Sequence, residues 1–494
     1  MNVLFINPSR WGRGITPIWI ASHAAVLKSR GHVVELFDAT FFKDWAHNEN
    51  AFNTANQQYR PSNYENLVVF SDVPVREALQ SAIDAFRPDV IFFAAISSHI
   101  HGEGEYAAIQ FANELISDLQ SQATVIAGGL QPTAAPAETA ARFANTQIFI
   151  RGESEMVLGE VVDALQTGAS LEGIEGLVRR VNGGFSVAPA QPIISDLDLI
   201  GAYDYSLFDD QVFLRPYNGE VLRAVDYEMS RGCPFTCSYC VETVIQSYYG
   251  FTEHTPRGML KVPKAYLRQK SAGRAFEEMS RLYNEKRVVL FRCQDTNFLT
   301  INRETLFGLA DLLDAANLPI KLYIETRPEG INEGTIPLLK RLRVDGVGMG
   351  VELSTQDFRE ANLNRFADQP AIIRAFKLLR DAGLKRTGYN IIGLPDQTEE
   401  SILDTVAFNR ILQPDNVTVA FYSPYIGTEQ QRKGAALSYF LDYEFDVDSQ
   451  LRTTSRHSVL SPELLAFYKR NFMRLVREGT DSLVHLKNQE GLRG

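Results

Sequence analysis

Apolar and polar residues alternate in a regular rhythm along the first third of the chain. Short apolar runs occur at 3–6, 33–37, 90–95, 124–128 and 147–150. Amphipathic stretches with helical spacing separate and follow them at 17–30, 76–86, 104–118, 136–143 and 154–166. Buried strands divided by helices are typical of a parallel sheet covered on both faces. We therefore predict a doubly wound, Rossmann-like domain over residues 1–166, with a long insertion at 39–75 and a ligand at the carboxyl ends of its strands.

The same rhythm returns six times in the second half. Strands are predicted at 226–230, 288–292, 321–325, 346–351, 388–392 and 417–421. Helices are predicted at 266–284, 303–315, 331–342, 367–382 and 398–411. Six such units indicate a (β/α)6 partial barrel over residues 220–430, in which chemistry collects at the carboxyl ends of the strands. The fold class is thus α/β.

Two changes in composition mark the remaining segments. Residues 167–219, rich in Gly, Pro and Asp, are predicted to form a linker between the two domains. Residues 431–494 are predicted to be a small, mostly helical region with helices near 434–442 and 461–478. We expect this region to cap the open side of the barrel or to dock on the first domain.

Charge, hydropathy and cysteine content argue against a nucleic-acid-binding protein, a membrane protein and a disulfide-rich protein. The 494 residues carry a formal net charge of −11, which argues against a broad nucleic-acid surface because phosphate binding needs clustered Lys and Arg. No apolar stretch approaches the ~20 residues of a membrane span, and the start lacks the pattern of a secretory signal. We expect a cytoplasmic protein without membrane insertion. Four cysteines argue against a disulfide framework.

Three of these cysteines stand together directly after the first strand of the second half. Cys233, Cys237 and Cys240 have the spacing C-x3-C-x2-C. A structural zinc site would need a fourth ligand, and the nearest candidates, His254 and Cys293, form no paired half-site. A [4Fe–4S] cluster normally takes four thiolates, so three would leave one iron open for chemistry. Three structural cysteines or a zinc site remain the alternative, and Cys293 is expected to be a buried core thiol.

The sequence RGCPFTCSYC resembles the signature of the radical S-adenosylmethionine (SAM) enzymes, and the resemblance covers roughly 222–430. Further stretches resemble the family in the expected order; they lie at 325–328, 350–352, 392–395 and 422–428. The resemblance implies that the three thiolates hold a [4Fe–4S] cluster and that the amino and carboxylate groups of SAM bind its fourth iron.

The same resemblance suggests the residues around SAM. Tyr239 takes the aromatic position before the last cysteine, and Arg327 would pair the SAM carboxylate. Glu352 would accept from the ammonium or ribose, and the backbone from Gly393 to Pro395 would approach the adenine. The alternatives are a salt-bridged barrel residue for Arg327, a strand-end cap for Glu352 and a plain turn for the GlyLeuPro stretch.

The first domain resembles the cobalamin-binding domain that precedes many radical SAM domains. The resemblance rests on ITPIWIASHAAVLKSRGHVVELFDAT, PDVIFFAAISS, TVIAGGLQPTAAPAE and IRGESEMVLGEVVDAL. It implies a corrin on the carboxyl ends of the strands, with contacts from Asn7, Pro8, Ser97, Ser98, Gly128, Gly129, Gly152 and Glu153. A GlyGly pair alone is equally typical of a strand-to-helix turn.

One departure concerns the ligand of cobalt. Many cobalamin domains supply a His through D-x-H-x-x-G, and none of the eight His here has Asp two residues earlier. His101 is followed by Gly104, but His99 stands in place of the Asp, and both follow the third strand instead of the first. We expect cobalamin to bind without a protein His, with its lower face near Asn7 to Arg10.

Together these resemblances imply a methyltransferase. A 5′-deoxyadenosyl radical would remove hydrogen from an unactivated carbon of a small-molecule or natural-product substrate, which would take its methyl from methylcobalamin. The electron would come from an external donor such as flavodoxin or ferredoxin. The alternative keeps both cofactors but leads to cyclisation, oxidation or rearrangement. A cobalamin-binding sensor has no need of the three-Cys loop, and a methylthiotransferase would carry cysteines in its first domain, whereas residues 1–232 have none.

The segment 241–265 after the cysteines is longer than a simple connection. It either covers the substrate cavity with Tyr248, Tyr249, Phe251 and His254, or packs as a surface loop.

Overall fold

A computed structural model describes residues 1–57, 59–96, 102–181, 183–422, 425–433, 445–446, 451–452 and 458–492. Ser97, Ser98, His99 and His101 lie outside the described residues, as does the helix expected near 434–442. No helix in the described part is long and apolar enough to cross a membrane.

The first sheet has the order β2-β1-β3-β4-β5-β6-β7. Its strands are β1 (Asn2–Asn7), β2 (Val33–Asp38), β3 (Val90–Phe93), β4 (Thr124–Ala127), β5 (Ile148–Ile150), β6 (Leu177–Val181) and β7 (Gly184–Val187). The first five are parallel, and β6 and β7 add an antiparallel hairpin. Every residue of β3 is buried, as expected for a central strand that is covered on both faces.

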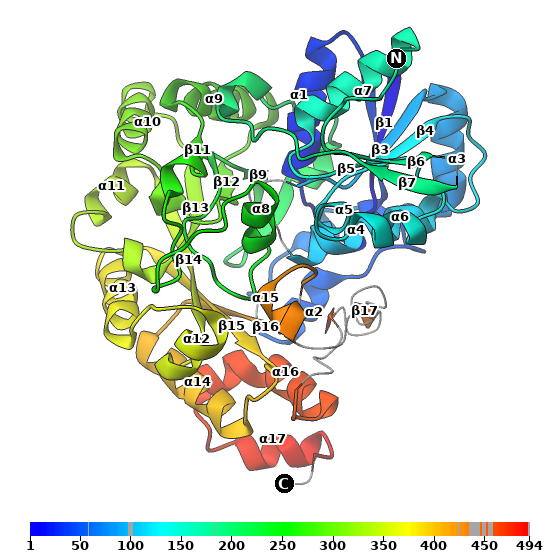
Figure 1. Ribbon diagram of the computed structural model, residues 1–494. Coiled ribbons are helices and arrows are strands. Elements are labelled where there is room, and N and C mark those ends of the chain that lie inside the picture. The colour runs from blue at the N-terminus through cyan, green and yellow to red at the C-terminus, as the bar shows by residue number, and fades with distance from the viewer. Residues whose placement is uncertain are drawn as a thin grey trace.

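Successive residues of β1 face opposite layers of helices. Val3 and Phe5 pack with α1 and α7, whereas Leu4 and Ile6 pack with α3 and α4. The helices of this domain are α1 (Ile18–Ser29), α3 (Val75–Phe86), α4 (Gly102–Ile116), α5 (Leu130–Ala134), α6 (Pro136–Arg142) and α7 (Glu155–Thr167). The insertion between β2 and α3 holds α2 (Glu49–Ala55) and two 3-10 turns, η1 (Ala39–Phe41) and η2 (Tyr64–Asn66). The doubly wound architecture predicted from the sequence is confirmed (Figure 1).

The first sheet extends beyond the boundary expected at residue 166. Leu177 and Val178 of β6 are fully buried beside β5, so the hairpin at 177–187 is part of the domain and not of a linker. The pattern LVRRV has only two consecutive apolar residues, which is too short a run to separate a strand from a connection by sequence. The rest of the expected linker holds η3 (Leu197–Ile200) and η4 (Asp210–Phe213).

The second sheet has the order β16-β15-β14-β13-β12-β9-β8. Its strands are β8 (Leu214–Tyr217), β9 (Glu220–Tyr227), β12 (Leu290–Cys293), β13 (Lys321–Thr326), β14 (Val344–Glu352), β15 (Lys385–Ile392) and β16 (Asn416–Phe421). Six are parallel and form an open half-barrel, and β8 adds an antiparallel edge. Two small pairs stand apart, β10 (Ser230–Arg231) with β11 (Arg268–Gln269), and β17 (Phe445–Asp446) with β18 (Leu451–Arg452).

Helices cover the outer face of the half-barrel (Figure 1). The helices of the second half are α8 (Glu242–Tyr248), α9 (Ala272–Lys286), α10 (Arg303–Ala316), α11 (Ile336–Arg341), α12 (Gln356–Leu363), α13 (Gln369–Asp381), α14 (Glu399–Leu412), α15 (Glu429–Lys433), α16 (Pro462–Glu478) and α17 (Leu483–Gln489). The outer layer consists of α9, α10, α11, α13, α14 and α16. Three 3-10 turns complete this part: η5 (Pro263–Ala265), η6 (Phe298–Thr300) and η7 (Pro328–Gly330). Phe291, Ile324 and Val347 belong to the core that these helices cover. The residues between them, such as Arg292 and Tyr323, therefore face the inside of the half-barrel.

The described part of the C-terminal region packs on the outer layer. Phe472 and Leu475 of α16 join a core with Ile402 of α14 and Val417 of β16. This differs from the expectation that the region caps the open side of the barrel or docks on the first domain. The reason is the apolar face of α16, which continues the helical layer over the last strand.

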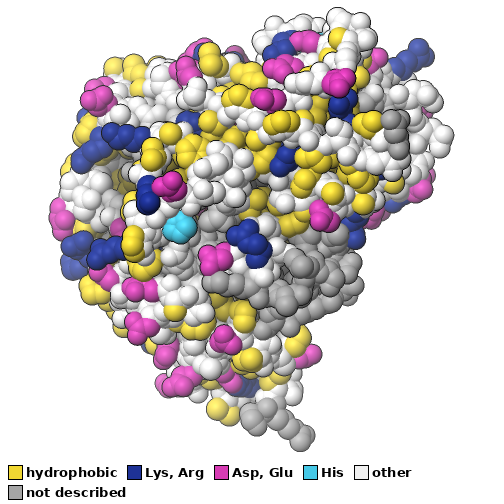
Figure 2. Space-filling model, viewed as in Figure 1, with side chains coloured by type: hydrophobic (Ala, Val, Ile, Leu, Met, Phe, Trp, Pro, Cys, Tyr) yellow, Lys and Arg dark blue, Asp and Glu magenta, His cyan; other side chains and the backbone are white. Residues whose placement is uncertain are grey.

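The two domains meet through α8. Val244 of α8 packs with Leu130 of α5 and with Ile426, and Ile245 packs with Ile96 at the end of β3. Hydrophobic side chains gather over the region where α5 and α6 approach α8 (Figure 2). The helix that follows the three cysteines thus lies against the carboxyl edge of the first sheet.

Candidate active site

The three cysteines lie on the loop between β10 and α8, beyond the carboxyl end of β9. The Gln246 side chain of α8 donates to the carbonyl oxygens of Cys233 (2.8 Å) and Phe235 (3.0 Å). The Asn364 amide donates to the carbonyl of Thr236 at 2.7 Å. Backbone groups of the loop are therefore held by side chains from α8 and from the residue that follows α12.

All three thiols are free, and those of Cys233 and Cys237 are buried. Burial, followed by the Glu242 carboxylate, raises the pKa of Cys233 to about 12. Burial and the neighbouring Cys237 raise the pKa of Cys240 well above its usual value. A thiol with so high a pKa ionises only when a positive centre takes its sulfur as a ligand, because the charge is then neutralised.

A guanidinium already stands beside this loop. Arg327, directly after β13, donates from Nη1 to Sγ of Cys237 at 3.4 Å, and its Cζ lies 3.7 Å from the Phe235 ring centroid. Its Nε and Nη2 both donate to Glu329, at 3.1 and 2.6 Å. The structure thus places Arg327 against the cysteines with its planar fork engaged by Glu329, and its contact with the SAM carboxylate stays a prediction.

In the described residues, no three His, Cys, Asp or Glu side chains are grouped as ligands of a single metal ion. A [4Fe–4S] cluster makes a different demand, because each thiolate binds an iron of its own. Three free thiols on one loop, with sulfur as the donor atom in each, match the ligand set of that cluster.

Glu352 ends β14 in a strained conformation. Its φ is +62°, which non-glycine residues rarely adopt, and its side chain is buried. The Tyr239 hydroxyl donates to Glu352 Oε1 at 3.0 Å, and Arg365 Nη1 lies 3.5 Å from the same oxygen. Arg365 also donates to the carbonyl of Gly350 at 2.6 Å. A Cβ at Gly350 would lie 2.2 Å from Glu352 Oε1, so a larger residue there would displace the Glu352 carboxylate.

Arg365 is a site residue that the sequence did not reveal. It follows α12 in the stretch NLNRF, which carries no recognisable motif. Its approach to Glu352 depends on how α12 folds back over the end of β14, and this could not be read from local pattern.

The GlyLeuPro stretch after β15 lies next to the cysteine loop. Gly393 has φ +83°, and its N–H donates to Gln397 Oε1 at 2.7 Å. Leu394 shares an apolar cluster with Tyr239 and Tyr422, whereas Pro395 is half-buried. The structure therefore brings Tyr239, Glu352 and the Gly393–Pro395 turn together.

At the carboxyl edge of the first sheet, small and polar residues follow the strands. Asn7 donates to Asp38 Oδ1 at 3.0 Å, and the Pro8 carbonyl accepts from Trp45 Nε1 at 3.2 Å. A Cβ on Gly128 would meet the Ala94 carbonyl at 2.8 Å, whereas one on Gly129 would find its nearest neighbour only at 3.8 Å.

This edge also offers features that suit a ligand. Gly129 has φ +104° and open surroundings, and the buried Ser9 hydroxyl has no hydrogen-bond partner in the part of the chain that is described. A flat ligand with polar substituents fits such an edge, and contact of these residues with cobalamin stays a prediction.

Gly152 and Glu153, expected at the same edge, face the second domain. A Cβ on Gly152 would lie 2.5 Å from the Tyr249 hydroxyl. Both Glu153 carboxylate oxygens accept from Arg268 Nη1, each at 2.7 Å. These residues therefore belong to the contact between the domains.

Glu153 is part of a buried network that we call the ionic seam: Glu153, Glu155, Glu228, Arg231 and Arg268. Arg231, two residues before Cys233, lies 2.6 Å from Glu155, 2.8 Å from Glu228 and 3.7 Å from Glu153. The carboxylates come from both domains. The seam therefore joins the start of the cysteine loop to the first domain.

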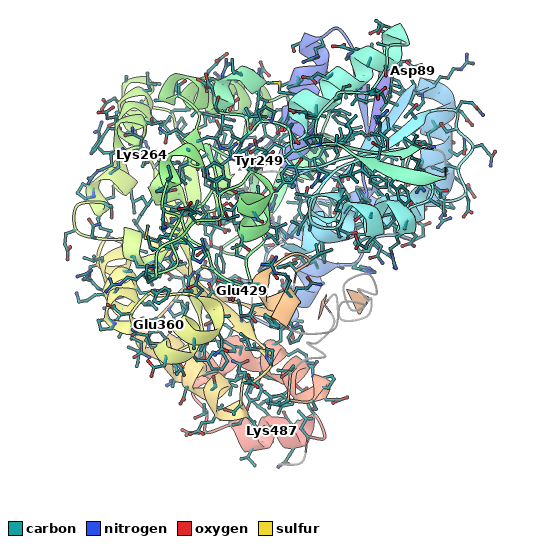
Figure 3. The ribbon with its side chains drawn as sticks, in the orientation of Figure 1. Asp89, Tyr249, Lys264, Glu360, Glu429 and Lys487 are labelled. Carbon is teal, nitrogen blue, oxygen red and sulfur yellow. The ribbon has the colours of Figure 1, made fainter. Side chains whose placement is uncertain are left out.

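The tyrosines of the segment 241–265 pack beside the seam. Arg151 lies 4.6 Å over the ring of Tyr248, whose hydroxyl donates to Gln191 at 2.6 Å. Tyr249 lies between α8 and the first domain, and its hydroxyl accepts from the Glu153 N–H at 2.8 Å (Figure 3). These two side chains therefore pack at the contact between the domains, and a role of the segment in covering the substrate stays a prediction.

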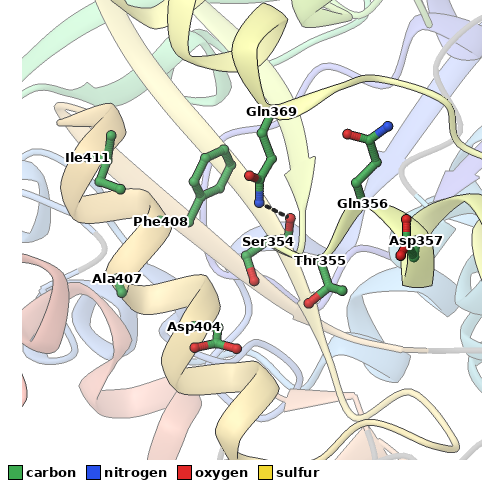
Figure 4. Close-up of a pocket in the computed structure, with 9 residues that line it drawn as sticks. All are labelled: Ser354, Thr355, Gln356, Asp357, Gln369, Asp404, Ala407, Phe408 and Ile411. Carbon is green, nitrogen blue, oxygen red and sulfur yellow. Dashed lines mark hydrogen bonds between the residues drawn. The ribbon is translucent and has the colours of Figure 1, made fainter.

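A separate hollow of about 480 Å³ lies among the helices that follow β14 (Figure 4). It is lined by Ser354, Thr355, Gln356, Asp357, Gln369, Asp404, Ala407, Phe408 and Ile411. None of the cysteines and none of the glycines at the first sheet's edge lines it, so it is not the candidate active site.

The cysteine loop lies within a segment that matches a known protein family. Residues 227–408 match the sequence profile of the Radical SAM superfamily. An uncharacterised methyltransferase of Pyrococcus horikoshii is 27% identical over 361 residues, which cover 73% of this chain and 71% of the relative. The anaerobic magnesium-protoporphyrin IX monomethyl ester cyclase of Rubrivivax gelatinosus is 25% identical and covers 86% of this chain and 68% of the relative.

Solved structures show the same architecture across both domains. The radical SAM methyltransferase TsrM from Kitasatospora setae, with cobalamin and a [4Fe–4S] cluster, has a TM-score of 0.63 at 16% identity and covers 88% of this chain and 75% of its own. OxsB, a cobalamin-dependent SAM radical enzyme, has a TM-score of 0.62 at 14% identity and covers 94% and 66%. Residues 227–408 thus match the Radical SAM superfamily profile, and the chain shares the fold of TsrM and OxsB across both of its domains.

Proposed function

We propose that this protein is a cobalamin-dependent radical SAM methyltransferase that acts on an unactivated carbon of a small molecule. The observation that carries the proposal is the position of the three free thiols. They lie at the carboxyl end of β9, on a loop whose following helix packs against the carboxyl edge of a doubly wound domain. The places where the two folds each bind a ligand therefore face one another.

The residues present fit three cofactors. Cys233, Cys237 and Cys240 would hold a [4Fe–4S] cluster, and Tyr239, Glu352 and the turn at Gly393 would surround SAM. Cobalamin would lie on the first sheet's edge, at Asn7, Pro8, Gly128 and Gly129. When bound, the cluster and SAM supply a hydrogen-abstracting organic radical, and cobalamin supplies a transferable methyl group.

The chain's own residues prepare the site for such chemistry. The apolar junction of Leu130, Val241, Val244 and Ile426 excludes water between the domains, which protects a reactive radical. Arg327 places a positive charge beside Cys237, and Arg365 with Tyr239 fixes the Glu352 carboxylate. An external low-potential donor such as flavodoxin or ferredoxin would deliver the electron.

Relatives with another outcome support a second candidate function. The Rubrivivax relative and a second one from Cereibacter sphaeroides, 23% identical over 439 residues, are named as cyclases. Cyclisation or oxidation would use the same three cofactors without transferring a methyl group.

The two candidates differ in the fate of the SAM methyl. Anaerobically reconstituted protein would be incubated with reductant, SAM bearing a deuterated methyl group, and a small-molecule extract of the source organism. We expect a new product that carries the labelled methyl, and none with the triple variant Cys233→Ala/Cys237→Ala/Cys240→Ala. A cysteine-dependent product without label would instead establish the second candidate. Iron and sulfide analysis of both proteins would show whether the thiols hold the cluster.

A further inference from the structure

The inner face of the half-barrel carries a charged side chain from β12. Phe291 and Cys293 belong to the outer core, so Arg292 between them faces inward. In the sheet register Arg292 stands beside Asp226 of β9 and Tyr323 of β13. Its guanidinium therefore lies in the interior, on the strand next to β9, whose carboxyl end leads to the cysteine loop.

The Asp226 carboxylate, which is next to Arg292 in the sheet register, already accepts hydrogen bonds from other residues. Asp226 Oδ2 accepts from Arg215 at 2.5 Å and from the Thr16 N–H at 3.1 Å, and its Oδ1 accepts from Gln294 at 2.7 Å. Asp226 influences Arg292 electrostatically without forming an ion pair with it.

The hydroxyl groups of Tyr323 and Tyr389, on the side of Arg292 away from β9, also have hydrogen-bond partners. The Tyr323 and Tyr389 hydroxyls lie 2.9 Å apart, and Tyr389 donates to Glu325 at 3.0 Å. Gly348 allows this pairing, because a Cβ there would lie 2.3 Å from the Tyr389 hydroxyl. The pair is therefore fixed in place along β14 next to Arg292.

Arg292 itself forms no hydrogen bond or ion pair with another residue of the described chain. Its nearest ring contact is Tyr323, at 5.6 Å from the centroid, and the side chain is half-buried. By contrast, the interior cations Arg13 and Arg215 each lie 2.5 Å from a carboxylate. A guanidinium that offers five donors away from bulk water is costly unless an acceptor reaches it.

The place of Arg292 suits one end of a substrate. Arg292 is the last residue but one of β12, so its Cα lies only about 3.3 Å below the strand's carboxyl end. Just beyond that end, Asp295 accepts from the N–H groups of Met229 (3.1 Å) and Ser230 (2.6 Å), directly before the cysteine loop. A molecule bound at Arg292 would therefore extend toward the cysteines.

We propose that Arg292 binds a carboxylate group of the substrate on the inner face of the half-barrel, beside the Tyr323–Tyr389 hydroxyl pair. The planar fork of arginine matches a carboxylate with two parallel hydrogen bonds. A phosphate would call for several cations, and the neighbouring Arg13 and Arg215 are already paired. This inference names the substrate class for the proposed function and rests on it.

Binding of benzoate, with benzamide as its neutral counterpart, tests the proposal without turnover. Saturation-transfer NMR and calorimetry would compare the wild-type chain with Arg292→Met, and with Arg223→Met as a matched control on the neighbouring strand, where Arg223 pairs with Asp210 at the surface. We expect benzoate to bind the wild type and the control, benzamide to bind neither, and Arg292→Met to bind benzoate roughly tenfold or more weakly, as expected for a lost charged hydrogen bond.

Equal benzoate binding by the wild type and Arg292→Met would overturn the proposal, as would preferential binding of inorganic phosphate. If Arg292→Met does not fold, Arg292 is structural and the proposal is also wrong. Arg292→Lys keeps the charge but lacks the fork, so it should fold and bind benzoate several-fold more weakly. Labelled methyl transfer without Arg292-dependent benzoate binding would contradict only this inference, whereas benzoate binding without methyl transfer would contradict only the proposed function.

Discussion

The arginines of the ionic seam have carboxylate partners, whereas the arginine on the inner face of the half-barrel has none among the described residues. In the seam, Arg231 and Arg268 meet three carboxylates, and Arg231, Glu155 and Glu228 are almost completely buried. On the inner face, Arg292 is half-buried and has no ion-pair partner among the described residues. The difference separates two uses of arginine: a paired guanidinium fixes one domain against another, whereas an unpaired one is available to a ligand.

The largest expected effect comes from breaking the seam at its centre. Arg231→Met leaves Glu155 and Glu228 buried without their cation, so we expect the free energy of unfolding to fall by roughly 3–5 kcal/mol. Urea denaturation followed by circular dichroism measures this loss. Arg292→Met makes the same chemical change on the inner face and is the control; a similar loss in both would show that the two regions do not differ.

A smaller loss is expected at the edge of the seam. Glu153→Gln keeps the shape of the side chain but removes the charge that accepts from Arg268, so we expect a loss of roughly 1.5–3 kcal/mol. Because Glu153 belongs to the first domain and Arg268 to the second, limited proteolysis between the domains should also accelerate. Unchanged stability and proteolysis would mean that the seam does not hold the domains together.

The pH dependence of stability should distinguish a paired carboxylate from an unpaired one. Burial opposes ionisation of Glu155, but Arg231 and His23 outweigh it and lower its pKa to about 2, from 4.5. The stability that Glu155 contributes is therefore present above pH 4.5 and is lost as the pH falls toward 2. Asp295 is buried with neutral donors, and burial raises its pKa from 3.8 to about 7. Its contribution is complete below pH 3.8 and is lost as the pH rises toward 7.

Thermal unfolding measured from pH 2 to 9 checks both expected changes in stability, the loss at acid pH from Glu155 and the decline toward pH 7 from Asp295. Asp295→Asn should flatten the decline between pH 4 and 7 and leave the acid limb unchanged, since it removes only the group whose pKa is raised. A decline that persists in Asp295→Asn would assign it to another group, such as Glu242, whose pKa burial also raises to about 7.

The smallest expected effect is that of Arg292→Met on stability. Because no described residue accepts a hydrogen bond from Arg292, we expect the free energy of unfolding to change by less than about 0.5 kcal/mol. The same denaturation series measures it. A loss of several kcal/mol would mean that Arg292 supports the fold, and the contrast between the two regions would disappear.

The sequence predicted the sheets far better than the seam. The central strands of the first sheet are continuous apolar runs, such as VIFF at 90–93, because they are covered on both faces, and such runs are local. The seam joins Glu153 to Arg268, which are 115 residues apart in the sequence, and no local pattern predicts a partner at that separation. Gly152 and Glu153 were expected at a cobalamin, yet the structure shows them against α8 and Arg268.

The candidate site shows the same division. The cysteine spacing is local and pointed to the loop, and Tyr239 and Glu352 come together as the resemblance implied. Arg365 reaches Glu352 only through the fold of α12, and Arg292 becomes distinctive only when its neighbours are seen to be engaged. Residues whose importance lies in what surrounds them cannot be recognised before the chain is folded.

The pairing of β10 with β11 has a consequence for how this protein can vary. Ser230 stands opposite Gln269, and Arg231 opposite Arg268, so the chain leaves and re-enters at one point. Both arginines form ion pairs with the first domain, Arg231 with Glu155 and Arg268 with Glu153. The segment 232–267 therefore begins and ends at one fixed point, the β10–β11 pair. The part of it that follows α8 could be lengthened or exchanged between relatives while this pair keeps the cysteines in place. New substrates could then be accommodated without a change in either domain.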